Sequence, residues 1–268
     1  MNFTEHKFSV IIPVHFAISE LQLKESFDSI VVNQQLLPSE LIIVIDGTIQ
    51  PSITDFINVY TSQLIIPCKL FFTGPSSKGP GFARNEAIKV ASYEWIAFID
   101  SDDLWTKDKL KEAVYEIKKD LSVNCVLHRQ IFLKQNKKQK YFDFDKYYNF
   151  NKPLKNQLYK TNFFAMSTIV MKKKLIIDNG GFNEFFQNAQ DYDLWLRIGN
   201  SFKIQIIKKY LGYNLERTGN ITSRPYHRKF KNLFCILYQN KNDVNYLIVL
   251  YRFIRIIFTL EWFKFIFM

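Results

Sequence analysis

Four short apolar runs, separated by helix-like segments, are the strongest constraint on the fold of this chain. The runs are residues 8–13, 40–45, 68–72 and 95–99. The first is continuously apolar apart from Ser9, and the others are mostly so, as in strands that are buried on both faces of a parallel sheet. The predicted helices between them span residues 19–34, 54–63 and 82–91. The order β-α-β-α-β-α-β therefore predicts an α/β fold, with a mostly parallel central sheet flanked by helices.

The rest of the chain is less regular. The elements expected there are a helix over 107–119, strands over 124–133 and 164–171, a polar and aromatic excursion over 135–155, and a helix from Asp191 to Ile198. No internal repeat and no clear linker is visible. We therefore expect one domain over residues 1–225, with halves of residues 1–110 and 111–225. A helical tail over residues 226–268 follows it.

The composition excludes several classes of protein. The 268 residues, 47% of them hydrophobic, are enough for a sizeable core, and 23% charged residues argue against global disorder. Three widely spaced cysteines without a CxxC pair support neither a disulfide framework nor a zinc site, and they favour a reducing compartment. The charged N-terminus is no secretory signal, and no run of about 18 uncharged apolar residues predicts a membrane-spanning helix. We expect a cytoplasmic protein.

Three carboxylates follow the last of the four apolar runs. Asp100, Asp102 and Asp103 lie where that predicted strand leaves the sheet. Like charges packed this closely repel, so a bound cation is the simplest reason for them. Oxygen ligands suit Mg²⁺ or Mn²⁺, which commonly hold phosphates as well. A helix N-cap is the alternative, but it explains only one of the three aspartates.

Polar groups also end the other runs, at His15 and Asp46. Ligands of open α/β sheets bind at the carboxyl ends of strands, so these groups are expected at one edge. A turn would explain Asp46 before glycine equally well if it stood alone. The loop before the third predicted helix runs from Gly79 to Asn85 and lacks the third glycine of a dinucleotide fingerprint. Arg84 there can bridge to the aspartates or to a phosphate.

A second acidic centre stands before the helix from Asp191 to Ile198. Asp191 and Asp193 can each be an N-cap without a chemical role. A carboxylate opposite a metal–nucleotide site is also what deprotonation of an acceptor hydroxyl requires. The pairing of this motif with the cluster at Asp100 favours the chemical interpretation.

The last residues, 246–268, are strongly apolar and aromatic but carry four charges, which argue against a membrane span. The formal net charge of the whole chain is +11, so anionic lipid, nucleic acid and phosphorylated ligands are candidate partners. We favour a tail that lies on an anionic membrane surface. The alternative is a helix packed on the domain or in a homodimer interface.

Taken together, these motifs resemble those of a known family, the family 2 glycosyltransferases, which are inverting enzymes of the GT-A fold. Val44–Thr48 is similar to the V-D-D-G-S segment of that family, and Phe98–Asp103 is similar to its DXD region. The motifs that complete the resemblance are Ser9–Val14 as the opening strand, Gly79–Asn85 as the G…A-R-N helix start, and Gln190–Arg197 as the E-D-Y-D-L-W-L-R acceptor-side motif. Their order and spacing make the combination specific over residues 8–225.

The resemblance implies a role for each matching residue. Asp191 is expected to be the catalytic base and Asp102 the ligand of Mn²⁺ or Mg²⁺. The expected nucleotide-sugar contacts are Pro13, Val14, His15, Asp46, Gly79, Arg84, Asp100, Ser101 and Asp102. The expected acceptor side is Gln190, Tyr192 and Trp195. Residues 1–110 become the nucleotide-sugar-binding half and 111–225 the acceptor half.

Three positions depart from the family pattern. Ile45 replaces the first aspartate of V-D-D-G-S, and Gln190 replaces the glutamate before the base. Some members have a histidine after the acceptor motif that helps to bind the metal, whereas residues 216–220 contain none. The third protein ligand of the metal is therefore not identified.

The resemblance implies transfer of a sugar from a nucleotide-diphospho sugar, with a bias to UDP, to a hydroxyl of a glycan or lipid-linked acceptor. The expected setting is the synthesis of surface polysaccharide or lipooligosaccharide at the inner face of the cell membrane. Two alternatives remain open: a sugar nucleotidyltransferase, and a non-enzymatic basic module that binds nucleic acid. The acidic edge of the sheet argues against the second, so nucleic acid is not an expected partner.

Overall fold

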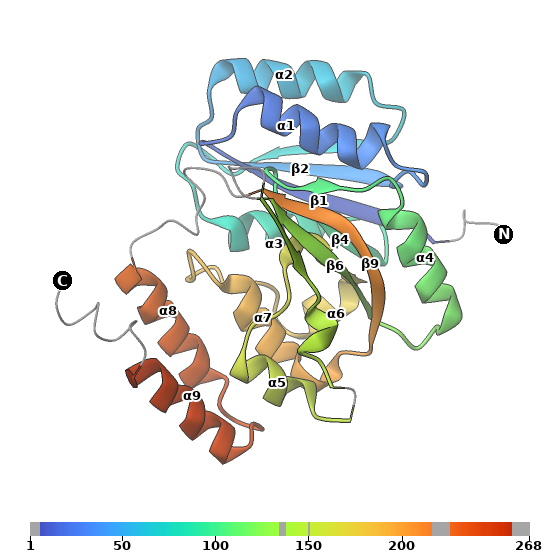
Figure 1. Cartoon of the computed structure of the whole chain (residues 1–268). Coiled ribbons are helices and arrows are strands. Elements are labelled where there is room, and N and C mark those ends of the chain that lie inside the picture. The colour runs from blue at the N-terminus through green and yellow to red at the C-terminus, as the bar shows by residue number, and fades with distance from the viewer. Residues whose placement is uncertain (1–5, 134–137, 150, 216–225, 259–268) are drawn as a thin grey trace.

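One sheet of nine strands runs through the domain in the order β3-β2-β1-β4-β8-β6-β9-β5, with β7 paired to β6 (Figure 1). The structure is a computed structural model, and it describes residues 6–133, 138–149, 151–215 and 226–258. The strands are β1 (Phe8–His15), β2 (Glu40–Asp46), β3 (Cys68–Phe72), β4 (Trp95–Phe98), β5 (Leu104–Trp105), β6 (Cys125–Leu133), β7 (Gln139–Phe142), β8 (Val170–Lys172) and β9 (Ile204–Leu215).

The four predicted parallel strands are confirmed. β1 pairs in parallel with β2 and β4, and β2 pairs in parallel with β3. Beyond β4 the sheet is mixed, because β8 is antiparallel to both β4 and β6, while β6 and β9 are parallel. The α/β fold is therefore as expected, with the parallel pairing concentrated in the N-terminal half.

Helices cover both faces of the sheet (Figure 1). They are α1 (Glu20–Phe27), α2 (Pro51–Ser62), α3 (Pro80–Val90), α4 (Lys109–Lys119), α5 (Leu154–Lys160), α6 (Lys173–Asp178), α7 (Gln190–Ile198), α8 (Tyr226–Gln239) and α9 (Tyr246–Phe258). One core lies under α1, α2 and α4 and contains Ile43, and a second lies under α3 and α5–α9 and contains Ile42. Successive strand residues enter opposite cores, which explains the continuous apolar runs.

Several elements differ from the sequence-based expectation. The predicted strand over 164–171 is a 3₁₀ turn at Met166–Thr168 followed by β8, and β5, β7, α5 and α6 were not predicted. The predicted helix over 19–34 is α1 followed by a π-helical turn over Asp28–Val32. The long strand β9 was not predicted from the sequence. It contains the charged pair Lys208-Lys209, and its register against β6 shifts near Arg129, so it shows no clean apolar period.

The predicted tail consists of the two helices α8 and α9, which pack on the domain. Ile236, Leu237 and Ile256 belong to the core under α3 and α5–α9, and the Tyr159 hydroxyl donates a hydrogen bond of 2.8 Å to the Leu237 carbonyl. The alternative of a helix packed on the domain thus applies to one face of α9. No helix among the described residues is long and apolar enough to cross a membrane.

An aromatic cluster fixes α7 against the sheet. Trp195 is fully buried and its ring lies 6.1 Å from Phe164, 6.1 Å from Phe202 and 6.4 Å from Phe182, measured between centroids. Rings at these separations and inclinations make favourable edge contacts in addition to the surface that they bury.

We predict that Trp195→Ala lowers the free energy of unfolding by about 3–5 kcal/mol, because it leaves a large cavity in this cluster. Urea denaturation of the purified variant measures the change. Phe185→Ala is the matched control: Phe185 is 93% exposed, and we expect a change within about 0.5 kcal/mol. Equal effects of the two substitutions would contradict the placement of Trp195 in the core.

Candidate functional site

The carboxyl ends of β2, β1 and β4 meet at one edge of the sheet. His15 is paired with Asp46 across β1 and β2, and the Ile99 amide donates to the Ile11 carbonyl at 3.1 Å where β4 ends. The predicted polar groups at His15, Asp46 and Asp100 are therefore neighbours along this edge. The side chain of Val14 lies in the core, whereas Pro13 is partly exposed. Of these two predicted nucleotide contacts, only the ring of Pro13 and the backbone are therefore accessible to a ligand.

Asp46 organises the loop that leads from β3 to α3. Its carboxylate accepts hydrogen bonds from the Thr73 and Ser77 hydroxyls, at 2.9 and 2.6 Å, and from the backbone amides of Lys78 and Gly79, both at 2.9 Å. Each oxygen accepts two of the four, which fills the lone-pair positions of a carboxylate. The carboxylate of Asp46 thus holds the loop over residues 73–79 in place, and all of its acceptor positions are used within the chain.

Gly79 precedes α3 and lies close to Gln187, which precedes α7. Its φ is +98°, a conformation that suits glycine, and a Cβ there would come within 2.8 Å of Gln187 Oε1. A Cβ at Gly81 would lie 3.4 Å from the side chain of Gln190. The start of α3 and the start of α7, more than a hundred residues apart, are therefore in contact beside the sheet edge.

Arg84 is buried and forms an ion pair with Asp100, with 2.5 Å between Nη2 and Oδ1. Within the described part of the chain, its Nε and Nη1 atoms have no hydrogen-bond partner. A buried guanidinium with unused donors is costly unless an anionic group completes it. The sequence left open whether Arg84 bridges to an aspartate or to a phosphate, and the structure shows the pairing with an aspartate.

The three carboxylates of the acidic turn do not converge. Asp103 is buried and accepts hydrogen bonds from the Ser167 hydroxyl at 2.5 Å and from Asn214 Nδ2 at 2.9 Å. Burial raises the pKa of Asp103 well above its usual value, and the charges of Asp100 and Asp102 raise it further. Ser101 is buried as well, whereas Asp100 and Asp102 are partly exposed.

A divalent cation fits this arrangement only with help from a substrate. The described residues contain no group of three or more histidine, cysteine or acidic side chains that could hold a metal ion. Mg²⁺ and related ions are, however, commonly bound by one or two carboxylates together with substrate phosphates and water. Asp102 and Asp100 supply oxygen donors of that kind at the end of β4.

Asp191 lies in the first turn of α7, and its Oδ1 accepts a hydrogen bond of 2.8 Å from the Tyr192 amide. Burial raises the pKa of Asp191, the charge of Asp100 raises it further, and Arg84 opposes both effects. Such influence requires proximity, and the contact of Gly81 with Gln190 likewise brings the start of α7 to the start of α3. Asp193 instead points inward, where it accepts from Arg197 at 2.8 Å and from Asn240 at 3.1 Å.

The residues expected on the acceptor side lie deeper than the sequence suggested. Trp195 and Tyr192 are buried, and the Tyr192 hydroxyl donates to the Leu158 carbonyl at 2.9 Å. Their placement speaks against direct contact with an acceptor and assigns them to the support of α7. Gln190 is buried beside Gly81, and its Oε1 has no hydrogen-bond partner among the described residues.

Several residues of the site gave no signal in the sequence. Thr73 and Ser77 hold Asp46, while Ser167 and Asn214 hold Asp103. They are isolated hydroxyl or amide residues without a recognisable spacing. Only the three-dimensional arrangement identifies them.

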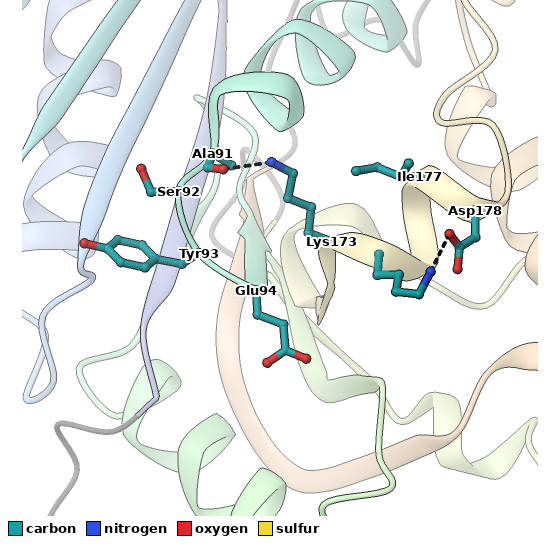
Figure 2. A pocket seen from close by; sticks show the side chains of 8 residues that line it. Ala91, Ser92, Tyr93, Glu94, Lys173, Ile177 and Asp178 are labelled. Carbon is teal, nitrogen blue, oxygen red and sulfur yellow. Dashed lines mark hydrogen bonds and ion pairs between the residues drawn. The ribbon is translucent and has the colours of Figure 1, made fainter.

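A cavity of about 400 Å³ lies at the opposite end of β4 (Figure 2). It is lined by residues 91–94 together with Lys173, Lys174, Ile177 and Asp178. Its cations are already engaged: Lys173 donates to the Ala91 carbonyl at 2.8 Å, and Lys174 is paired with Asp178 at 3.0 Å. The cavity therefore lies away from the predicted chemistry and offers no convergent free donors.

Comparison with known proteins agrees with this geometry. The sequence model described as Glycosyl transferase family 2 matches residues 9–180. An uncharacterized glycosyltransferase of Methanocaldococcus jannaschii is 26% identical over 230 residues, which are 85% of this chain and 77% of that protein. The O-antigen biosynthesis glycosyltransferase WbnJ of Escherichia coli is 34% identical over 193 residues, 72% of this chain and 71% of WbnJ. The chain spans 32% of the length of two Rickettsia glycosyltransferases.

Among solved structures, Staphylococcus aureus TarS 1–349 in complex with UDP superposes with a TM-score of 0.71. The match has 21% sequence identity and covers 97% of this chain and 74% of that chain. At this identity the likeness concerns the fold, and it confirms the predicted GT-A architecture. Taken with the match over residues 9–180 and the similarity to WbnJ, these findings show that the chain belongs to glycosyl transferase family 2.

Proposed function

We propose that this protein is a metal-dependent, inverting glycosyltransferase. It transfers a sugar from a nucleotide-diphospho sugar, with UDP as the favoured nucleotide, to a hydroxyl of a glycan or lipid-linked acceptor. The observation that carries the proposal is the meeting of Arg84, Asp100 and Asp191 at the carboxyl edge of the parallel strands. Family membership favours sugar transfer over the alternatives of nucleotidyl transfer and nucleic-acid binding.

The donor binds, in this proposal, along the edge formed by β1, β2 and β4. The loop held by Asp46 lies at this edge, and Arg84, paired with Asp100, supplies a positive charge beside the diphosphate. Asp102, with Asp100 beside it, would hold Mn²⁺ or Mg²⁺. When bound, such an ion neutralises charge that develops on the leaving diphosphate.

Asp191 is proposed as the general base. It lies in the first turn of α7, which contacts the start of α3. The charges of Arg84 and Asp100 affect its pKa. It accepts the proton of the acceptor hydroxyl as that oxygen attacks the anomeric carbon. A single displacement of this kind inverts the anomeric configuration.

The names of relatives support the choice of substrates. TarS binds UDP, and WbnJ is named for the synthesis of O-antigen. We therefore propose a role in the assembly of surface polysaccharide or lipooligosaccharide at the inner face of the membrane.

Helix α9 supports the proposed membrane contact because both of its faces are apolar. Ile256 is buried on one side, whereas Leu247, Leu250 and Ile254 are 70%, 43% and 44% exposed on the other. Their spacing of three, four and seven residues forms one stripe. Residues 226–258 hold six lysines and arginines against a single acid, Asp243, which suits an anionic bilayer. Residues 259–268, also part of the expected tail, lie outside the described residues.

We predict that Asp191→Asn lowers kcat by about 10²–10⁴-fold and leaves the Kd for UDP nearly unchanged. The substitution removes the proposed proton acceptor but no proposed contact with the nucleotide. Because the pKa of Asp191 is raised, transfer by the wild-type enzyme falls with decreasing pH through a pKa above the usual carboxyl value of about 3.9. Rate measurements from pH 4 to 8 with titration of UDP check both. Asp55→Asn, at an exposed site on α2, is the control. Turnover by Asp191→Asn equal to that of this control would remove Asp191 from the role of base.

Asp102→Asn is expected to abolish the gain in UDP affinity that Mn²⁺ provides, because it removes the charge of the proposed metal ligand. We expect a loss of roughly 10–100-fold in affinity with Mn²⁺ present, and little change without it. Calorimetric titration of UDP with and without Mn²⁺ measures this. Asp178→Asn, at an exposed helix end, is the control. An unchanged Mn²⁺ effect would argue against Asp102 as a ligand.

The wild-type protein is expected to sediment with phosphatidylglycerol vesicles and not with phosphatidylcholine vesicles. The triple variant Leu247→Ser, Leu250→Ser, Ile254→Ser should lose this binding because it removes the exposed apolar stripe. Leu121→Ser, at a site that is 73% exposed elsewhere on the surface, is the matched control. Point substitutions are preferable to deletion of α9, which would also remove Ile256 from the core. A dimer that dissociates in the triple variant, without vesicle binding, would identify a homodimer interface instead.

A further inference from the structure

Lys109, at the start of α4, has no exposed surface. Fully buried lysines are rare unless their amine is paired, because removal of the amine from water is costly. Burial lowers the pKa of Lys109 well below its usual value, and the negative charge of Asp103 opposes this in part. A buried amine so close to the acidic turn calls for an explanation in terms of its contacts.

The amine of Lys109 donates to two acceptors. Its Nζ lies 2.8 Å from His128 Nε2 and 2.9 Å from the Ser167 carbonyl oxygen. His128 Nδ1 lies 2.7 Å from the Arg129 carbonyl, which can only accept, so Nδ1 carries the proton and Nε2 is the acceptor for Lys109. The ring of Trp105, 4.5 Å from Nζ, covers the amine. Lys109 is therefore a donor that ties α4 to β6 and to the segment before β8.

Ser167 continues the connection to the acidic turn. Its hydroxyl donates to Asp103 Oδ2 at 2.5 Å and accepts from the Asp100 amide at 3.1 Å. The turn itself is closed by a hydrogen bond of 3.0 Å from the Asp103 amide to the Asp100 carbonyl. Ser167 thus holds the residues on both sides of the segment that contains Asp102.

Two further contacts show that this arrangement is built into the fold. Trp105 Nε1 donates to the same Ser167 carbonyl at 2.9 Å, so that oxygen is fixed from two directions. On β9, a Cβ at Gly212 would lie 3.1 Å from His128 Cε1 and 3.3 Å from the Leu104 carbonyl. Glycine at this position lets β9 approach both the histidine and the strand that follows the acidic turn.

We propose that Lys109 is a positioning residue for the metal-holding turn, acting through Ser167 to fix the backbone on both sides of Asp102. The inference rests on the proposed function, in which Asp102 binds the ion. Groups that hold and orient a metal ligand commonly change metal affinity by roughly 10–100-fold when they are removed. Lys109 itself does not touch the donor or the ion in this proposal.

The experiment compares the full-length wild-type protein with Lys109→Met, which keeps most of the side-chain volume and removes the donor. The quantity measured is the ratio of the UDP dissociation constants without and with Mn²⁺, by calorimetry. We expect Lys109→Met to reduce this ratio by roughly 10-fold or more and to leave the Kd without Mn²⁺ unchanged. Lys107→Met, at an exposed site two residues away, is the matched control and should retain the wild-type ratio.

Ser167→Ala is the second variant, because it removes the bridging hydroxyl with little change in volume and leaves the carbonyl that Lys109 contacts. We expect it to reduce the same ratio, and it decides the question if Lys109→Met does not fold. A wild-type ratio in a folded Lys109→Met, or in Ser167→Ala, would overturn the proposal and leave the role of Asp102 intact. The absence of any Mn²⁺ effect in the wild-type protein would overturn the proposed function, and this inference with it.

Discussion

The ion pair between Arg84 and Asp100 is the interaction on which the arrangement of the site depends. It joins the first turns of α3 to the end of β4, and it is buried on the arginine side. A buried charge without its partner is strongly destabilising, so α3 cannot move away from the acidic turn without a large cost. Because α3 also contacts the start of α7 through Gly81, the pair indirectly fixes where Asp191 stands.

The carboxylates near this pair divide into two kinds. Asp46, Asp103 and Asp193 are buried and accept hydrogen bonds from their own chain, so they shape a loop, a turn and a helix. Asp100, Asp102 and Asp191 are partly exposed at the sheet edge. The chemistry that we propose uses only the second kind, and the first kind keeps it in place.

Sequence alone predicted much of the fold, because strands buried on both faces leave an unmistakable apolar run. It also predicted that His15, Asp46 and Asp100 lie along one edge, since they stand at the carboxyl ends of β1, β2 and β4. It could not predict how each aspartate is placed: Asp102 and Asp103 are adjacent, yet Asp102 is partly exposed and Asp103 is buried against Ser167, which is 64 residues away along the chain. Nor could it predict Lys109, because a lysine in an amphipathic helix is normally solvated and only the packed structure reveals its burial.

The packing of α8 and α9 bears on how this protein can evolve. The family model matches residues 9–180, yet Trp195, Ile236 and Ile256, which lie beyond that range, complete the same core. The folding unit is therefore longer than the segment that the family model matches. A recombination breakpoint between β9 and α8 would separate side chains that pack in one core.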